Sequence, residues 1–81
     1  EENETDLFSV YPNPTNGMLN IASILPSGTI NIYNAIGELI FSIQLQSQNT
    51  MIDLREFETG IYFIQLINDD NLMVTRKIIK E

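Results

Sequence analysis

Few side chains in this sequence could carry out catalysis or hold a metal. The chain has no Cys and no His, which excludes thiol catalysis and thiolate metal sites and removes the commonest general base and metal-binding imidazole. The remaining candidates are acidic: a carboxylate pair, Glu56 and Glu58, and the oxygen-rich turn Asp69-Asp70-Asn71.

Neither acidic group is sufficient for the chemistry it suggests. The carboxylate pair is not accompanied by a nucleophile and base. Calcium takes roughly six to eight oxygen ligands, more than one three-residue turn supplies without a second loop. We therefore expect no catalytic residue, no cofactor and no metal site.

The charge balance argues against two further classes of partner. The net charge is −7, from eleven acidic and four basic residues, so a basic face for nucleic acid or anionic lipid is not expected. No apolar run approaches the roughly 18 residues of a membrane-spanning helix. The sequence thus predicts neither nucleic-acid binding nor direct membrane insertion.

Three of the four basic residues, Arg76, Lys77 and Lys80, lie close together near the end of the sequence. Two interpretations remain open. Charged residues on a last strand protect a sheet edge against unwanted pairing. Alternatively, the strand docks onto a partner's sheet, with backbone hydrogen bonds giving affinity and the charges giving selectivity.

The length of 81 residues indicates one domain, and a domain of this size buries only about 60% of its unfolded surface. Residues 1–6 hold four acids and nothing apolar, which is typical of a mobile linker where proteases cut. We expect a linker over 1–6 and a folded domain over 7–81. Because the chain lacks an initial Met and a signal peptide, we interpret it as a piece of a longer protein.

The elements that would position these residues are strands. The most strand-prone run, 60–67, is apolar on nearly both faces and predicts a central strand. Alternation elsewhere predicts further strands, with turns at the spacing typical of a sandwich or barrel. The predicted strands are 7–11, 18–22, 29–34, 38–45, 50–53, 60–67 and 72–79. The predicted inward residues are Leu19, Ile21, Ile30, Ile32, Leu39, Phe41, Ile43 and Leu45.

The last strand can be read with either face inward. Leu72, Val74 and Ile78 are the favoured inward set, which leaves Arg76 on the same face near an edge. The alternative turns the odd-numbered residues 73–79 inward. Before the central strand, the pattern Asp53 to Glu56 resembles a capping box, and Leu54 with Phe57 predicts one 3₁₀-like turn.

Turn residues and strand-ending prolines separate these strands. Pro12-Asn13-Pro14 ends the first strand, and its prolines predict an edge that pairs poorly with a neighbour. Gly17, Gly37 and Gly60 stand where turns require backbone freedom. Tyr62 is expected in the core with its hydroxyl on a partner.

Four segments together resemble the type A C-terminal sorting domain of the type IX secretion system of Bacteroidetes-type bacteria. Each segment alone is a weak turn-and-strand pattern, but their order and spacing match the family over residues 7–81. The segments are Tyr11-Pro12-Asn13-Pro14-Thr15-Asn16-Gly17, residues 32–40 (IYNAIGELI), residues 52–54 with 60–66 (IDL and GIYFIQL), and residues 75–81 (TRKIIKE).

The resemblance implies an immunoglobulin-like antiparallel β-sandwich of about seven strands, the last domain of an exported protein. In the family, this domain carries its parent through the outer-membrane translocon. A sortase-type cysteine protease then removes it, and the parent is released or joined to anionic lipopolysaccharide at the cell surface. The resemblance therefore implies a protease substrate and a targeting signal, not an enzyme.

The resemblance also implies which residues take part in sorting. The matching positions are Pro12, Asn13, Pro14, Gly17, Gly37, Gly60, Tyr62, Lys77 and Lys80. Family members are cut just before the domain, which places cleavage within residues 1–6, although no motif there fixes the bond.

A second hypothesis is a non-catalytic immunoglobulin-like binding module of carbohydrate or adhesin type. Such modules usually expose aromatic rings for stacking on sugars. Aromatic residues are 9% of this chain, and most lie at predicted core positions, which favours the sorting hypothesis. In either case, exposed strand edges in a small domain allow an edge-paired dimer.

Overall fold

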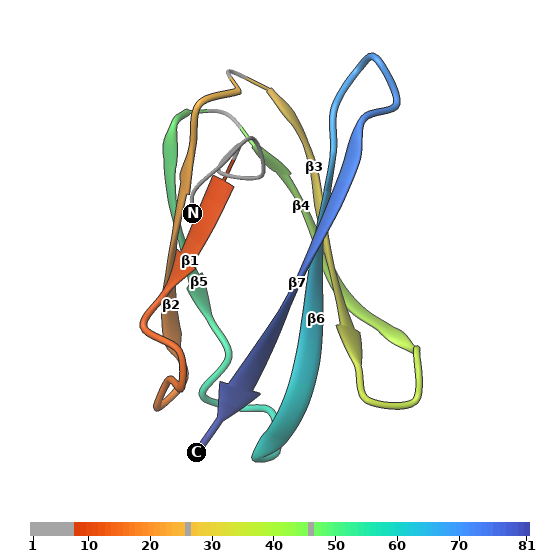
Figure 1. Cartoon of the computed structure of the whole chain (residues 1–81). Helices are drawn as coiled ribbons and strands as arrows, with labels where there is room; N and C mark the ends of the chain where they lie inside the picture. Colours follow the sequence, from red (N-terminus) through yellow and green to blue (C-terminus); the bar gives the residue numbers. More distant parts are fainter. Residues whose placement is uncertain (1–7, 26, 46) are drawn as a thin grey trace, which may run out of the picture.

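The computed structural model describes residues 8–25, 27–45 and 47–81. The predicted linker 1–6 lies outside the described residues, as do Leu7, Pro26 and Gln46. In these described parts of the chain, seven strands form two antiparallel sheets that pack face to face (Figure 1). The three-stranded sheet has the order β1 (Phe8–Tyr11), β2 (Met18–Ser23), β5 (Asn49–Asp53), and the four-stranded sheet has the order β4 (Leu39–Leu45), β3 (Gly28–Asn34), β6 (Gly60–Ile67), β7 (Met73–Lys80). The predicted β-sandwich is confirmed.

The core fills the space between the sheets with alternate residues of the strands, as period-two patterning requires. The inward assignments of Leu19, Ile21, Ile30 and Ile32 are confirmed, because each side chain is at most 1% exposed. Full burial of such a side chain contributes about 1.5–3 kcal/mol. The buried apolar residues are Phe8, Leu19, Ile21, Ile30, Ile32, Leu45, Ile52, Leu54, Tyr62, Ile64, Leu66 and Ile78.

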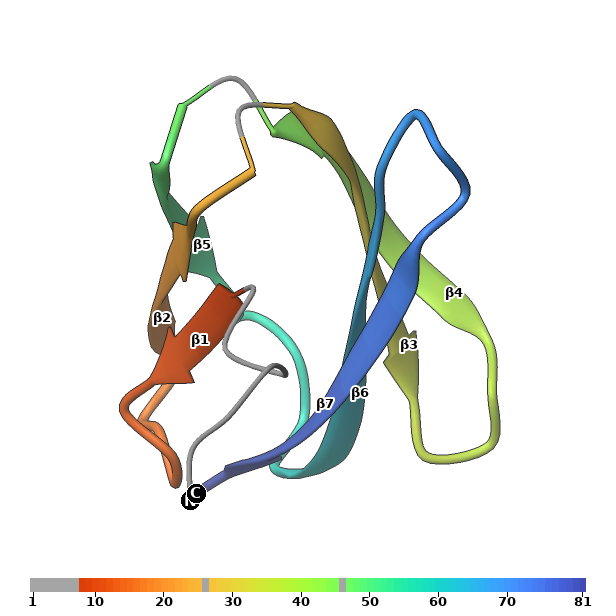
Figure 2. The ribbon, with the colours of Figure 1, turned by 45° about the horizontal axis from the view of Figure 1, so that its top comes forward.

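Strand β6 has the central position that its composition predicts. It pairs with β3 on one side and with β7 on the other. Tyr62, Ile64 and Leu66 face the core, while Phe63 and Gln65 lie half-buried on the outer face. The two sheets leave β1 and β7 at neighbouring edges (Figures 1 and 2).

Strand β4 corrects one inward assignment. The β3–β4 register pairs Ile32 with Phe41 but Tyr33 with Leu39, so Ile40 is an extra residue in a β-bulge. An extra residue moves the side chains beyond it to the opposite face. Leu39 is therefore 54% exposed and its inward assignment is wrong, whereas Ile40 packs against the core.

Strand β7 follows the favoured parity. Ile78 is buried, Val74 packs half-buried against the core, and Arg76 is half-buried on the same face. The odd-numbered residues 73–79 are exposed. The assignment of Leu72 is wrong, because it precedes the strand in the turn and is 41% exposed.

The segment before β6 forms the single predicted turn. The Phe57 N–H donates to the Leu54 carbonyl at 3.0 Å. The Asp53 carboxylate accepts from the Arg55 N–H at 2.9 Å, one residue earlier than the capping pattern predicts. No helix within residues 8–25, 27–45 and 47–81 has the length and hydrophobicity to cross a membrane.

Candidate recognition site

Eight of the nine residues assigned to sorting from the sequence lie at one end of the sandwich, and the ninth, Lys77, lies just beyond the middle of β7 toward that end. The loops 12–17, 35–38 and 54–59 and the C-terminal end of β7 meet there (bottom of Figure 1). Every second connection between the antiparallel strands returns to this end, so segments far apart in sequence converge. We call this region the motif end.

Asn13 joins the first motif to the last strand. Its Nδ2 donates to the Lys77 carbonyl at 3.1 Å, and its Oδ1 accepts from the Ile79 N–H at 3.0 Å. One carboxamide thus meets a donor and an acceptor on the outer edge of β7, as a neighbouring strand's peptide group would.

The backbone at Thr15 continues this pairing. The Thr15 N–H donates to the Ile79 carbonyl at 2.9 Å, and the Glu81 N–H donates to the Thr15 carbonyl at 2.8 Å. Thr15 and Lys80 form a parallel β-bridge. Residues 12–14 form no backbone bridge with a neighbouring strand, as the prolines predict; the Asn13 side chain and the Thr15 backbone make the contacts with β7 instead.

Thr15 is a structural residue of the site that the sequence reasoning missed. Its side chain is 2% exposed, and its hydroxyl donates to the Met18 carbonyl and accepts from the Gly17 N–H at 3.0 Å. A Thr hydroxyl that bonds its own turn in this way is a recurrent motif. The signal was present in the Thr-Asn-Gly order of residues 15–17.

Gly17 is required by a close approach between loops. Its carbonyl accepts from the Leu54 N–H at 2.7 Å. Its φ is +132°, and a Cβ there would lie 2.6 Å from Arg55 Cγ and 3.1 Å from Arg55 Cα. A side chain would separate the loop 12–17 from the 53–57 turn.

Two of the three bases near the end of the chain point inward. Lys80 is 8% exposed, and its Nζ donates to the Phe57 carbonyl at 2.8 Å. Arg76 Nη2 donates to the Phe8 carbonyl at 3.3 Å, and its guanidinium carbon lies 5.0 Å from the centre of the Phe8 ring. Both side chains therefore join β7 to the other half of the sandwich. Lys77 faces outward and is exposed.

Tyr62 is buried at the start of β6 and donates its hydroxyl to the Glu58 carbonyl at 2.5 Å. The expectation of a core tyrosine with a bonded hydroxyl is confirmed. This geometry is the tyrosine corner found in immunoglobulin-like sandwiches. Burial, with a smaller contribution from the Glu58 carboxylate, raises the pKa of Tyr62.

The other two glycines of the motif end lie in or beside turns. Gly37 has φ +90°, which favours glycine, and its N–H donates to the Asn34 carbonyl at 3.0 Å. The Asn34 side-chain oxygen accepts from the N–H groups of Ile36 and Glu38, which closes the hairpin. Gly60 begins β6 opposite Lys80.

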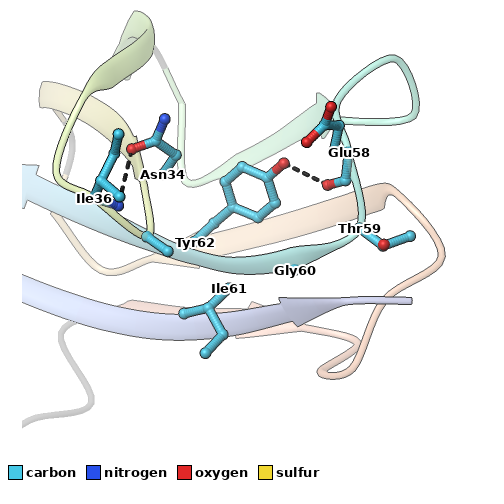
Figure 3. Close-up of a pocket in the computed structure, with 8 residues that line it drawn as sticks. Asn34, Ile36, Glu58, Thr59, Gly60, Ile61 and Tyr62 are labelled. Carbon is cyan, nitrogen blue, oxygen red and sulfur yellow. Dashed lines mark hydrogen bonds between the residues drawn. The ribbon is translucent and has the colours of Figure 1, made fainter.

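A surface pocket of about 230 Å³ opens at the motif end between the β3–β4 hairpin and the start of β6 (Figure 3). Asn34 and Ile36 border one side, Glu58 and Thr59 the other, and the Tyr62 ring lies between them. Within the described parts of the chain, no three metal-ligating side chains gather at one place. The lining offers shape and hydrogen-bonding groups.

The other acidic residues that the sequence singles out lie in or beside turns that local hydrogen bonds hold. The turn with Asp69 and Asp70 lies at the opposite end, where the Asn68 carboxamide accepts from the Asp70 and Leu72 N–H groups. Asp53 bonds Arg55 through both carboxylate oxygens at 2.9 Å. These hydrogen bonds from Arg55 lower the pKa of Asp53 to about 2.

Comparison with known proteins identifies a matching family. The model of the secretion system C-terminal sorting domain matches residues 9–81. Beta-agarase A of Zobellia galactanivorans is 31% identical over 75 residues, and the endo-acting ulvan lyase of Formosa agariphila is 31% identical over 72 residues. The matches cover 90% and 86% of this chain but only 14% of each relative.

Proposed function

Because the chain belongs to the secretion system C-terminal sorting domain family, we propose that the export machinery recognises the motif end of the folded sandwich. The domain directs its parent protein across the outer membrane through the type IX secretion system, to the cell surface or the extracellular space. Membership of the family implies an interaction with the secretion machinery.

The observation that supports the motif end is the convergence of four separate segments through specific contacts. Buried members such as Gly17, Tyr62 and Lys80 hold the loops and β7 in place. Pro12, Pro14 and Lys77 are exposed beside them. A partner would therefore meet a preorganised surface, which lowers the entropic cost of binding.

The proposal includes removal of the domain after export. A sortase-type cysteine protease would cut within the acidic linker 1–6, ahead of the domain 7–81. The composition of the linker supports this placement, because four acids and no apolar residue give it little to bury. Mass spectrometry of an exported reporter would locate the cut, and an end beyond residue 7 would contradict it.

A reporter fusion tests the sorting role. Residues 1–81 are joined to the C-terminus of a periplasmic reporter in a host with the type IX system, and the reporter is assayed in the medium and on the cell surface. We expect export that disappears in a host without the translocon. A reporter that stays in the periplasm of the competent host contradicts the proposal.

One observation favours a binding module as the second candidate function. Tyr33 and Phe63 are cross-strand neighbours on the outer face of the four-stranded sheet, and both are half-buried rather than buried. Paired rings can stack on sugars. Chemical-shift changes at these rings on titration with oligosaccharides would support this function.

For an edge-paired dimer, we propose β4 or β5 as the pairing edge, because Asn13 and Thr15 occupy the end of β7.

A further inference from the structure

The cross-strand register gathers apolar side chains on the outer face of the four-stranded sheet. Tyr33 lies between Leu39 and Phe63, and Phe63 is followed by Lys77 on β7. The next pair toward the motif end is Ile61 with Ile79, which are 38% and 41% exposed. We call these residues the outer patch: Tyr33, Leu39, Ile61, Phe63, Ile79 and Lys77.

Toward its other end, the same sheet face is polar on β3 and β4, whereas β6 and β7 carry the apolar pair Ile67 and Met73. Ser42 donates to the Asn31 side chain at 2.7 Å, and Gln44 donates to the Thr29 hydroxyl at 3.3 Å. A sheet face that meets only water is expected to be polar along its whole length. In the half that adjoins the motif end, apolar side chains lie on all four strands of this face, and such a patch is typical of an interaction site.

The patch continues toward the pocket of about 230 Å³, which Ile61 and the 80% exposed Ile36 help to line. Figure 3 shows the Ile61 side chain on the opposite side of β6 from the Tyr62 ring, as strand alternation requires. A partner's apolar side chain could therefore lie across β6 and β7 while a neighbouring one enters the hollow.

The positive charge of Lys77 requires a negative charge on a partner that covers it. Its side chain is exposed and forms no hydrogen bond or ion pair with any residue that the structure describes. Covering an ammonium group without a counter-charge is unfavourable. The outer patch of a second copy is a poor occupant, because it presents another Lys77 and no carboxylate.

From these observations we propose that the outer patch docks onto an apolar protein surface of the export machinery that carries a carboxylate opposite Lys77. This inference rests on the proposed sorting function and names the face and chemistry of the contact. An anionic lipid surface is disfavoured by the net charge of −7.

The test measures binding of the reporter fusion to detergent-solubilised translocon purified from the competent host. The double variant Ile61→Thr with Ile79→Thr keeps β-branched residues on the strands but removes apolar surface. The variant Lys77→Glu reverses the charge. We expect each to weaken binding by about tenfold or more, as central interface positions do.

Matched controls make the result specific. Met51→Thr changes a 63% exposed apolar residue on the other sheet and should bind like the parent. Lys77→Arg keeps the positive charge and should bind more tightly than Lys77→Glu. Thermal melts followed by circular dichroism check folding. If the double variant does not fold, Lys77→Glu decides the question. Unchanged binding by Lys77→Glu overturns the inference, as does an equal loss with Met51→Thr.

Export separates this inference from the function on which it rests. If the unmodified fusion is not exported, the sorting function fails. If the unmodified fusion and the outer-patch variants are exported and bound equally well, the sorting function stands and the docking face is wrong.

Discussion

At the scale of single residues, Asn13 shows how a side chain can replace a strand. Proline flanks it on both sides, so the local backbone offers no donor at residues 12 and 14. The carboxamide of Asn13 instead meets the Lys77 carbonyl and the Ile79 N–H. Asn is one of two side-chain types that provide both an amide donor and a carbonyl acceptor in one planar group.

Asn13→Asp tests this role. The carboxylate keeps the acceptor for Ile79 but loses the donor to Lys77 and faces that carbonyl with a negative charge. We expect the free energy of unfolding to fall by about 1 kcal/mol or more, measured by urea denaturation. Asn16→Asp, an exposed change in the same loop, is the control. Equal effects of the two variants would contradict the role of Asn13.

Tyr62 gives a pH-dependent prediction. Burial raises its pKa in the folded state, so the unfolded chain loses this proton first as the pH rises above about 10. The stability linked to the phenol is therefore fully present below pH ~10 and is lost as the pH rises through the raised folded pKa. Urea midpoints between pH 8 and 11 should fall for the parent chain.

Tyr62→Phe separates the hydroxyl from the ring. Loss of the bond to the Glu58 carbonyl should lower stability by about 1 kcal/mol at neutral pH. The fall of the urea midpoint above pH ~10 should become smaller, because this titrating group is gone. An unchanged pH profile would show that Tyr62 is not the group responsible.

At the scale of elements, the basic residues of β7 have two roles, packing inside the sandwich and exposure on its surface. The alternation of a strand sends Arg76 and Lys80 toward the other half of the sandwich and Lys77 toward solvent. Lysine tolerates this burial because its long stem packs against apolar groups while the ammonium reaches a carbonyl. The clustering of bases in the sequence therefore does not describe a single basic surface.

Paired substitutions distinguish the two tasks. Lys80→Ala removes a buried stem and its bond to the Phe57 carbonyl, so we expect a loss of about 1–3 kcal/mol in stability. Lys77→Ala should change stability by no more than about 0.5 kcal/mol while reducing export of the fused reporter. Thermal melts and the export assay are compared. Equal destabilisation by both variants would contradict this division.

At the scale of the whole molecule, folding and recognition share the same contacts. The C-terminal end of β7 contributes the buried Ile78 and the edge groups that Asn13 and Thr15 bind. A domain of this size has little stability to spare. Deleting residues 77–81 would remove core and recognition surface together, so point variants that preserve the fold are the sharper probes of export.

Much of this architecture is local in origin, and the sequence alone determined it. Alternating apolar residues placed the strands and their inward faces, and the composition of residues 60–67 placed β6 at the centre of its sheet. The turn at Gly37 and the buried Tyr62 followed from residue chemistry. Each of these features depends on periodicity or on turns a few residues long, and the family resemblance rested on the same segments.

The tertiary structure alone decided the features that join distant segments. The bulge at Ile40 depends on how two strands pair, and it turned Leu39 outward. Asn13 bonds Ile79 across 66 positions, and Lys80 bonds Phe57 across 23. No local pattern specifies such contacts, because they exist only after the two sheets have packed and brought β1 and β7 to neighbouring edges.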